Sequence, residues 1–155
     1  VTQRVHQIGG ALVAAGADPL ELHQLLYNTY TPKRLRFFGH CLSQRLKTIP
    51  ELNTVYFAIP QADIERYDIG TGDTEGLVNY TLSVKDTRLG ILMIEYPDKT
   101  KLSFRSIGDV PANAMAGHFG GGGHFNAAGA RSTKNLSETE AELLNLLQNF
   151  TDVLR

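Results

Sequence analysis

The sequence is poor in cysteine and in long apolar stretches, and neither sign of charge is in excess. Cys41 is the only cysteine, which excludes a disulfide framework and is typical of a reducing compartment. The apolar runs are far too short to cross a bilayer, and the first residues, VTQRVHQ, lack the hydrophobic stretch of a signal peptide. Because 15 lysines and arginines face 16 aspartates and glutamates, no global basic field points to nucleic acid. We therefore expect a cytoplasmic globular protein without a membrane partner.

Metal ligands are scarce as well. The histidines are scattered along the chain: His6, His23, His40, His118 and His124. No carboxylate cluster accompanies them, and no two have the His-x-x-x-His spacing of a helical metal site. The sequence therefore predicts no metal centre in this chain.

Apolar residues recur at helical spacing through residues 1–48. Asp18 is placed to cap a helix that begins at Pro19, and Gly16 is placed to end the helix before it. A third helix is expected to bury an apolar stripe made of Leu35, Phe38, Leu42 and Leu46. The chain has no initiator methionine and enters the helical pattern at once, so we expect a piece of a longer protein; a processed complete chain is the alternative.

From about residue 50 the pattern changes to strands alternating with helices. Strands are predicted at 54–60, 88–96 and 101–108. Helices are predicted at 61–67, 71–83, 109–119 and 137–154. The expected caps of the last three are Asp73 or Thr74, Asp109, and Ser137 in a capping box with Glu140. The expected fold is α/β, a mixed β-sheet with flanking helices that follows an all-helical segment, with a boundary near Pro50.

Four consecutive glycines interrupt this pattern in GHFGGGGHFNAAG, residues 117–129. A flexible linker is one interpretation, but apolar Phe119 and Phe125 flank the run, which favours an ordered segment. Successive glycines can direct several N–H groups into one concavity. If HFNAA begins a helix, its N-terminus adds positive partial charge, and small residues at 127–129 let that helix pack closely under the loop. The run then predicts a rigid anion cradle with His124 at its mouth.

The same stretch carries a family resemblance. FGGGGHFNAAGA resembles the signature of the C-terminal associated domain of Asp-His-His (DHH) phosphoesterases. DTEGLVNY at 73–80 and KLSFRSIGDVPANAMAGHFGGGGH at 101–124 resemble the oligoribonuclease and adenosine-bisphosphate phosphatase branch. Residues 11–42 resemble the end of the catalytic domain and its connecting helix. The resemblance implies that 1–48 come from the end of a truncated DHH domain and that 49–155 form the DHH-associated substrate-binding domain.

The resemblance also implies what is missing. The catalytic domain of these enzymes holds two divalent metals, usually manganese, on aspartates and histidines that include an Asp-His-His run, and none occurs here. We expect no catalytic residue, cofactor or hydrolysis in this chain alone, and a manganese-dependent phosphoesterase or exoribonuclease in the parent protein. The implied partners are a nucleotide or short single-stranded RNA or DNA and the missing DHH domain. A homodimer is possible, but the sequence does not give the oligomeric state.

The substrate-binding residues implied by the resemblance are Arg105 and Ser106 of the Arg-Ser motif, Gly120, Gly121, Gly122 and Gly123 of the glycine run, and His124. A guanidinium suits bidentate phosphate recognition. Without the resemblance, the sequence favours Arg105 as a surface strand residue paired with a carboxylate, and His124 could equally be a core or capping histidine.

Other charged residues have plainer interpretations. A basic third helix with its flank could be a solvated face or the wall of an oligonucleotide cleft: Lys33, Arg34, Arg36, Arg45 and Lys47. A structural or exposed role is expected for His118. Capping and packing roles are expected for Glu75 and Asn79.

Three functions compete. The first is the substrate-binding part of a DHH phosphoesterase that hydrolyses short RNA or adenosine bisphosphate. The second is the same part of a cyclic-dinucleotide phosphodiesterase. The third is a non-catalytic RNA-binding module like that of alanyl-tRNA synthetases, whose glycine motif usually differs from the one found here.

Overall fold

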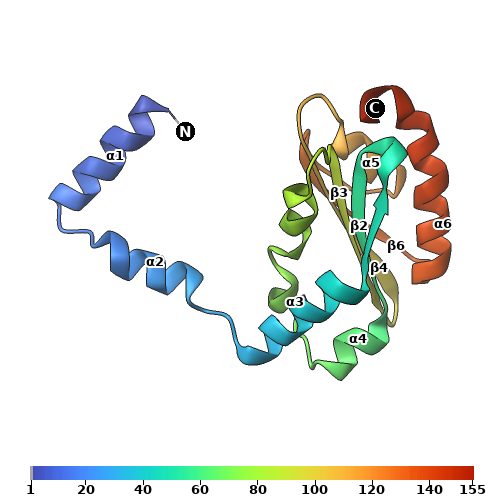
Figure 1. Ribbon diagram of the computed structural model, residues 1–155, viewed down its shortest axis with the longest axis horizontal. Helices are drawn as coiled ribbons and strands as arrows, with labels where there is room; N and C mark the ends of the chain where they lie inside the picture. Colours follow the sequence, from blue (N-terminus) through green and yellow to red (C-terminus); the bar gives the residue numbers. More distant parts are fainter. Residues whose placement is uncertain (1) are drawn as a thin grey trace. The chain divides into compact units, whose positions relative to one another are not determined.

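The computed structural model describes residues 2–155, and its contacts divide the chain into two units between Pro32 and Lys33 (Figure 1). None of the helices in the described residues is long and apolar enough to cross a membrane.

The first unit consists of two helices, α1 (Gln3–Ala14) and α2 (Pro19–Tyr27). The predicted cap is confirmed, since the Asp18 side chain accepts hydrogen bonds from the amides that open α2. Gly16 follows α1 with a φ of 100°, a left-handed conformation that favours glycine. The apolar stripes remain exposed: Leu12 of α1 is 56% exposed and Leu26 of α2 is 67% exposed. Neither α1 nor α2 has a buried residue.

The second unit is built on a six-stranded sheet with the order β1-β2-β3-β4-β6-β5. Its strands are β1 (Leu46–Ile49), β2 (Thr54–Ile59), β3 (Leu89–Tyr96), β4 (Lys99–Ser106), β5 (Gly122–His124) and β6 (Ala127–Ser132). β2 and β3 are parallel and every other neighbouring pair is antiparallel. The expected mixed sheet of an α/β fold, preceded by a helical segment, is therefore confirmed.

Helices cover both faces of the sheet. The α-helices are α3 (Pro32–Gln44), α4 (Gln61–Arg66), α5 (Ala112–His118), α6 (Leu136–Leu147) and α7 (Thr151–Leu154). The 3-10 helices are η1 (Pro50–Leu52), η2 (Thr71–Thr74), η3 (Leu77–Ser83) and η4 (Gln148–Phe150). In Figure 1, α3 and α6 lie on opposite sides of the strands.

The two faces of the sheet have separate cores. On one face, Phe104 of β4 and Ile91 of β3 pack with α5 and α6. On the other, Leu92 of β3 packs with Phe37 of α3 and Leu77 of η3. β3 is thus buried on both faces, which explains its continuous apolar sequence.

The second face is covered over only part of the sheet. On β4, the residues that share a face with Leu92 are half-buried, whereas Leu102 and Phe104 on the opposite face are fully buried. On β6, the outward Gly129 and Arg131 are exposed while their neighbours are buried. β4, β6 and β5 therefore present an open surface, called here the open face, beside the region that α3 and η3 cover.

The third helix differs from its predicted stripe. Phe37, Phe38 and Cys41 are buried, whereas Leu35 is 55% exposed and Leu42 is 39% exposed. The helix ends at Gln44, so that Leu46 opens strand β1 instead of closing a helical stripe. α3 packs on the sheet of the second unit; the assignment of residues 1–48 to the end of a catalytic domain stays a prediction.

Three predicted helix starts are wrong in detail. Residues 71–83 form two 3-10 helices, and the Asp73 carboxylate accepts from the amide of Gly70 at 3.0 Å. Asp109 pairs with Arg88 instead of capping α5. The cap of α6 is Asn135, whose side chain accepts from the amide of Glu138 at 2.9 Å. Several Asp, Asn, Ser or Thr residues lie near each of these helix starts, and any of them could cap a helix. The residue at which the helix begins decides which of them is used as the cap.

Candidate functional site

The glycine run forms part of a β-hairpin. β5 pairs with β6 through Gly122 opposite Gly129 and His124 opposite Ala127, which leaves Phe125 and Asn126 as the turn. The expected helix at HFNAA, with its N-terminal charge, is wrong. Ala128 and Ala130 are buried, whereas Gly129 and Arg131 are exposed; small side chains conceal this period-two pattern in the sequence.

The glycines permit close backbone packing. A β-carbon on Gly121 would overlap the carbonyl oxygen of Gly129, and one on Gly123 would lie 2.7 Å from the carbonyl oxygen of Ala127. Gly120 and Gly123 also have positive φ values, 69° and 146°. The run is therefore an ordered segment and not a flexible linker.

The backbone donors of the run are partly used by the protein. The amide of Gly120 donates to the carbonyl of Gly117 at 3.0 Å, and that of Gly121 donates to the carbonyl of Ala116 at 2.9 Å. Because both carbonyls belong to α5, these two N–H groups fix the end of that helix. The predicted cradle of glycine N–H groups therefore lacks at least these two donors.

Arg105 and His124 lie in one row across the open face. Arg105 of β4 is directly opposite Ala127 of β6, and Ala127 is directly opposite His124 of β5. Residues directly opposite in neighbouring strands project to the same side of a sheet. Two strand spacings separate the backbones of Arg105 and His124, about 10 Å. The methyl group of Ala127 is the only side chain between them.

The surroundings of Arg105 leave its guanidinium available. On β3 its partner is Gly90, where a β-carbon would overlap the Thr81 hydroxyl of η3. Arg105 Nη1 donates to the carbonyl of Phe104 at 2.8 Å. Within residues 2–155 no ion pair forms between Arg105 and a carboxylate, so the alternative of a salt-bridged strand residue is not supported.

Ser106 has a different position from its neighbour. It is buried, and its hydroxyl donates to the carbonyl of Val110 at 2.6 Å and accepts from Asn126 Nδ2 at 2.9 Å. Asn126 Nδ2 also donates to the carbonyl of Gly108 at 3.0 Å. Ser106 therefore fixes the hairpin turn that carries His124, and it faces the protein instead of the open face.

The open face holds two cations that the sequence did not reveal. Lys101 of β4 is directly opposite Arg131 of β6, and both share the side of Arg105. Neither belongs to an ion pair among the described residues, and no acidic residue occupies an outward position on these three strands. Although the net charge of the chain is −1, this surface is purely cationic. Only knowledge of the β4–β6 pairing would have brought the two together.

The basic third helix and its flank are largely paired. Lys33 pairs with Asp68 at 2.9 Å, Arg45 with Asp63 at 2.6 Å, and Lys47 with Glu140 at 2.5 Å. Arg34 Nη2 donates to the backbone carbonyl of Glu75 at 2.6 Å. These contacts within the protein support neither a wholly solvated face nor a cationic wall.

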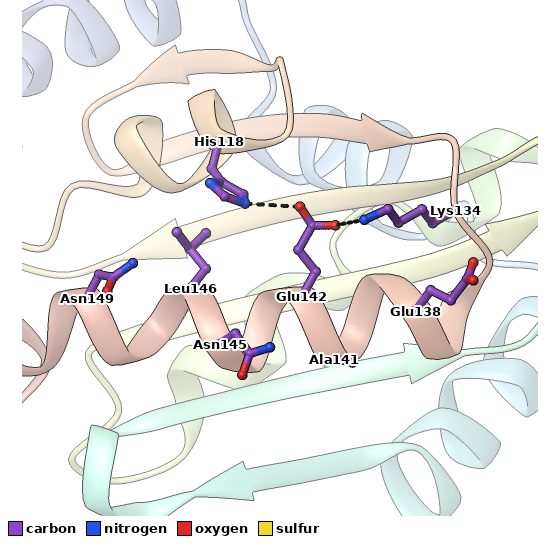
Figure 2. Close-up of a pocket in the computed structure, with 8 residues that line it drawn as sticks. All are labelled: His118, Lys134, Glu138, Ala141, Glu142, Asn145, Leu146 and Asn149. Atoms are coloured by element: carbon purple, nitrogen blue, oxygen red, sulfur yellow. Dashed lines mark hydrogen bonds and ion pairs between the residues drawn. The ribbon is translucent and has the colours of Figure 1, made fainter.

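A pocket of about 590 Å³ lies along α6, away from the open face (Figure 2). His118 Nε2 donates to one Glu142 oxygen at 3.0 Å, and Lys134 Nζ donates to the other at 2.9 Å. The hydrogen bond from Lys134, joined by that from His118, holds the pKa of Glu142 below its usual value. His118, Glu142 and Lys134 of this pocket satisfy one another, so the pocket is a weaker candidate than the open face, and His118 has a structural contact here.

The described residues do not fit a manganese site, because no three His, Cys, Asp or Glu side chains among residues 2–155 come together as metal ligands. No chemical step is therefore assigned to a metal in this chain.

The family model of the DHHA1 domain matches residues 53–153. The chain belongs to this family. It is 30% identical to an exopolyphosphatase-related protein from Bacteroides fragilis, covering 99% of this chain and 45% of that one, with a TM-score of 0.94. It is also 31% identical over 127 residues to the A-adding tRNA nucleotidyltransferase of Aquifex aeolicus, covering 81% of this chain and 15% of the relative.

A third likeness concerns the fold alone. The pGpG-specific phosphodiesterase of Vibrio cholerae matches all of this chain and 53% of its own, with 12% identity and a TM-score of 0.56. The DHHA1 chain thus spans less than half the length of the B. fragilis protein and a small part of the tRNA enzyme. The DHHA1 match itself contains the whole open face.

Proposed function

We propose that this DHHA1 chain binds the phosphates of a nucleotide or short single-stranded oligonucleotide for a cytoplasmic, manganese-dependent phosphoesterase. The parent enzyme hydrolyses short RNA or adenosine bisphosphate, and its chemical step belongs to a catalytic domain outside this chain. The observation that carries the proposal is the row Arg105–Ala127–His124 on the open face.

The row has the chemistry that a phosphate needs. A planar guanidinium donates two parallel hydrogen bonds to phosphate oxygens, and an imidazole N–H can donate a third from the other side of the anion. Ala127 leaves room between them. Binding the terminal phosphate also orients the substrate, which lowers the entropic part of the barrier in the catalytic domain.

The first unit has exposed apolar side chains that fit an interface with a further domain. Leu12, Leu25 and Leu26 are more than half exposed on α1 and α2. Exposed apolar surface of this kind marks interaction sites. In the proposed enzyme, this surface packs against the catalytic domain.

Isothermal calorimetry with adenosine monophosphate and adenosine 3′,5′-bisphosphate tests the proposal. Arg105→Ala and His124→Ala are each expected to weaken binding about tenfold or more, because each removes a charge-assisted or polar contact to phosphate. Arg66→Ala, on α4, is the matched control and should leave affinity unchanged. Unchanged affinity in both site variants, with circular dichroism showing intact folds, would refute the site. Manganese-dependent turnover by this chain alone would refute the division of labour.

The identity to the tRNA enzyme supports a second candidate, an RNA-binding module without a phosphoesterase partner. Competition separates the two. If intact tRNA displaces a labelled trinucleotide far better than equal concentrations of trinucleotide do, the module is favoured. If tRNA and unlabelled trinucleotide displace the labelled trinucleotide equally well at the same concentration, the short-substrate proposal is favoured.

A further inference from the structure

Another arginine, Arg88, lies beside the Arg105–His124 row. It directly precedes β3, and the pairing of β3 with β4 continues through it, because the amide of Ile107 donates to the carbonyl of Arg88 at 2.9 Å. Gly90, two residues further along β3, is directly opposite Arg105. Side chains two residues apart on a strand project to the same side, so Arg88 emerges on the side of the sheet that carries Arg105.

The distance between the two arginines suits a shared ligand. Arg88 is a diagonal neighbour of Arg105, and diagonal neighbours on adjacent antiparallel strands lie about 7–8 Å apart. Long side chains can meet across this distance. Two guanidinium groups placed in this way can bind the same phosphate, each through charge-assisted hydrogen bonds.

In the structure, Arg88 is engaged by a carboxylate of the protein. Its Nη2 donates to Asp109 Oδ1 in an ion pair. A β-carbon on Gly108 would lie 3.9 Å from the same Nη2, so the guanidinium lies next to the loop that follows β4. The contact with Asp109 therefore draws the guanidinium of Arg88 away from the Arg105–His124 row.

This ion pair is exposed enough to be exchanged. The Asp109 side chain is 77% exposed, and that of Arg88 is 31% exposed. Exposed pairs contribute little to stability, because both partners are well solvated when they separate. A phosphate carries more charge than a carboxylate and has more acceptor oxygens, so it can take the guanidinium from Asp109.

The loop that carries Asp109 is fixed on both sides of this residue. Asn126 Nδ2 donates to the carbonyl of Gly108 at 3.0 Å. The hydroxyl of Ser106 donates to the carbonyl of Val110 at 2.6 Å. The exchange therefore needs a rotation of side chains and no movement of this loop.

We propose that Arg88 is a further phosphate-binding residue of the site, and that Asp109 is an internal anion that holds it until phosphate arrives. The inference rests on the function proposed above and adds a device that regulates the same site. Phosphate bound at the Arg105–His124 row takes the Arg88 guanidinium from Asp109, and the exposed carboxylate stays in water. Asp109 thus weakens phosphate binding although it does not touch the ligand.

Calorimetry of the 155-residue chain with adenosine monophosphate tests the exchange. Arg88→Ala is expected to bind about three- to tenfold more weakly, because it removes a charge-assisted donor that must first leave its ion pair. Asp109→Asn keeps the size of the side chain, releases Arg88, and is expected to bind about three- to fivefold more tightly. The two changes form a double-mutant cycle: in the Arg88→Ala background, Asp109→Asn should alter affinity by less than about twofold.

Asp98→Asn is the matched control for charge. Asp98 is 72% exposed and paired with Lys99, in the turn at the far end of β3 and β4. This variant should bind as the wild type does. A gain equal to that of Asp109→Asn would show a general charge effect and overturn the exchange, as would a gain from Asp109→Asn that persists without Arg88.

Wild-type affinity in a folded Arg88→Ala variant, or weaker binding by Asp109→Asn, would also overturn the inference. If circular dichroism shows that Arg88→Ala is unfolded, Arg88→Lys takes its place in the cycle; it keeps the charge but loses the planar fork, and should bind at least about twofold more weakly than the wild type. If Arg105→Ala abolishes binding while the cycle shows no coupling, the exchange fails and the proposed function stands. If adenosine monophosphate does not bind at all, both fail.

Discussion

Arg105 and His124 project from the same side of the sheet because each is directly opposite Ala127. β6 lies between their strands, so the distance between them depends on one intervening strand and its single small side chain. This arrangement makes the proposed phosphate site sensitive to Ala127, a residue that carries no polar side chain of its own.

Ala127→Leu should therefore weaken nucleotide binding about tenfold or more, because a branched side chain occupies the space between the two phosphate donors. Ala127 is half-buried on the open face, so the fold should tolerate the change. Calorimetry with adenosine monophosphate measures the loss, and urea unfolding checks stability. Ala127→Ser, which adds one oxygen, is the control and should retain binding. Wild-type affinity in the leucine variant would mean that the phosphate does not lie between Arg105 and His124.

The glycine run offers a second prediction with a control inside the run. A β-carbon on Gly121 would overlap the backbone of β6 at Gly129, whereas one on Gly122 would have no atom within 4 Å. Gly121→Ala should lower the free energy of unfolding by about 1–3 kcal/mol, as overpacking does. Gly122→Ala should change it by less than about 0.5 kcal/mol. Urea denaturation of both variants compares them directly, and equal effects would show that the close approach of Gly121 to β6 is not needed.

The sequence correctly predicted the strands and helices in which large apolar side chains recur at regular spacing. β3 and β4 have strong apolar or alternating patterns, and in the predicted C-terminal helix Leu143, Leu147 and Leu154 recur at helical spacing and are buried. The β5–β6 hairpin was missed because its strands consist mainly of glycine and alanine, which have low strand propensity and little contrast between the two faces.

The site was predicted in part. Arg105 was named through the family resemblance and His124 already through the glycine run, and the structure places them in one row. Lys101 and Arg131 could not be found in the sequence, since 30 residues separate them and only the pairing of β4 with β6 makes them neighbours. Ser106 was assigned to the substrate, but its hydroxyl is used within the protein.

The last prediction concerns Asp63, a carboxylate that joins α4 to the end of α3. Its side chain is 6% exposed, and it accepts hydrogen bonds from Arg45 Nε at 2.6 Å, Arg45 Nη2 at 3.1 Å and His40 Nε2 at 3.0 Å. Burial acts to raise the pKa of Asp63, but the hydrogen bonds from Arg45 and His40 outweigh it and lower the pKa below the usual 3.8. A lowered pKa in the folded state means that this carboxylate stabilises the protein fully above pH 4 and loses its effect as the pH falls through the folded value.

Asp63→Asn should therefore lower the free energy of unfolding at pH 7 by roughly 2–3 kcal/mol, since it removes the charge from a set of charge-assisted hydrogen bonds. Urea unfolding at pH 7 and pH 3 measures the difference from wild type, which should be smaller at pH 3 because the wild-type carboxylate is then losing its charge. Asp98→Asn is the matched control, because Asp98 lies in an exposed turn with Lys99 at 3.2 Å, and a surface pair of this kind contributes little. A difference between Asp63→Asn and wild type that stays the same at pH 3 would mean that the stabilisation comes from the shape of the side chain and not from its charge.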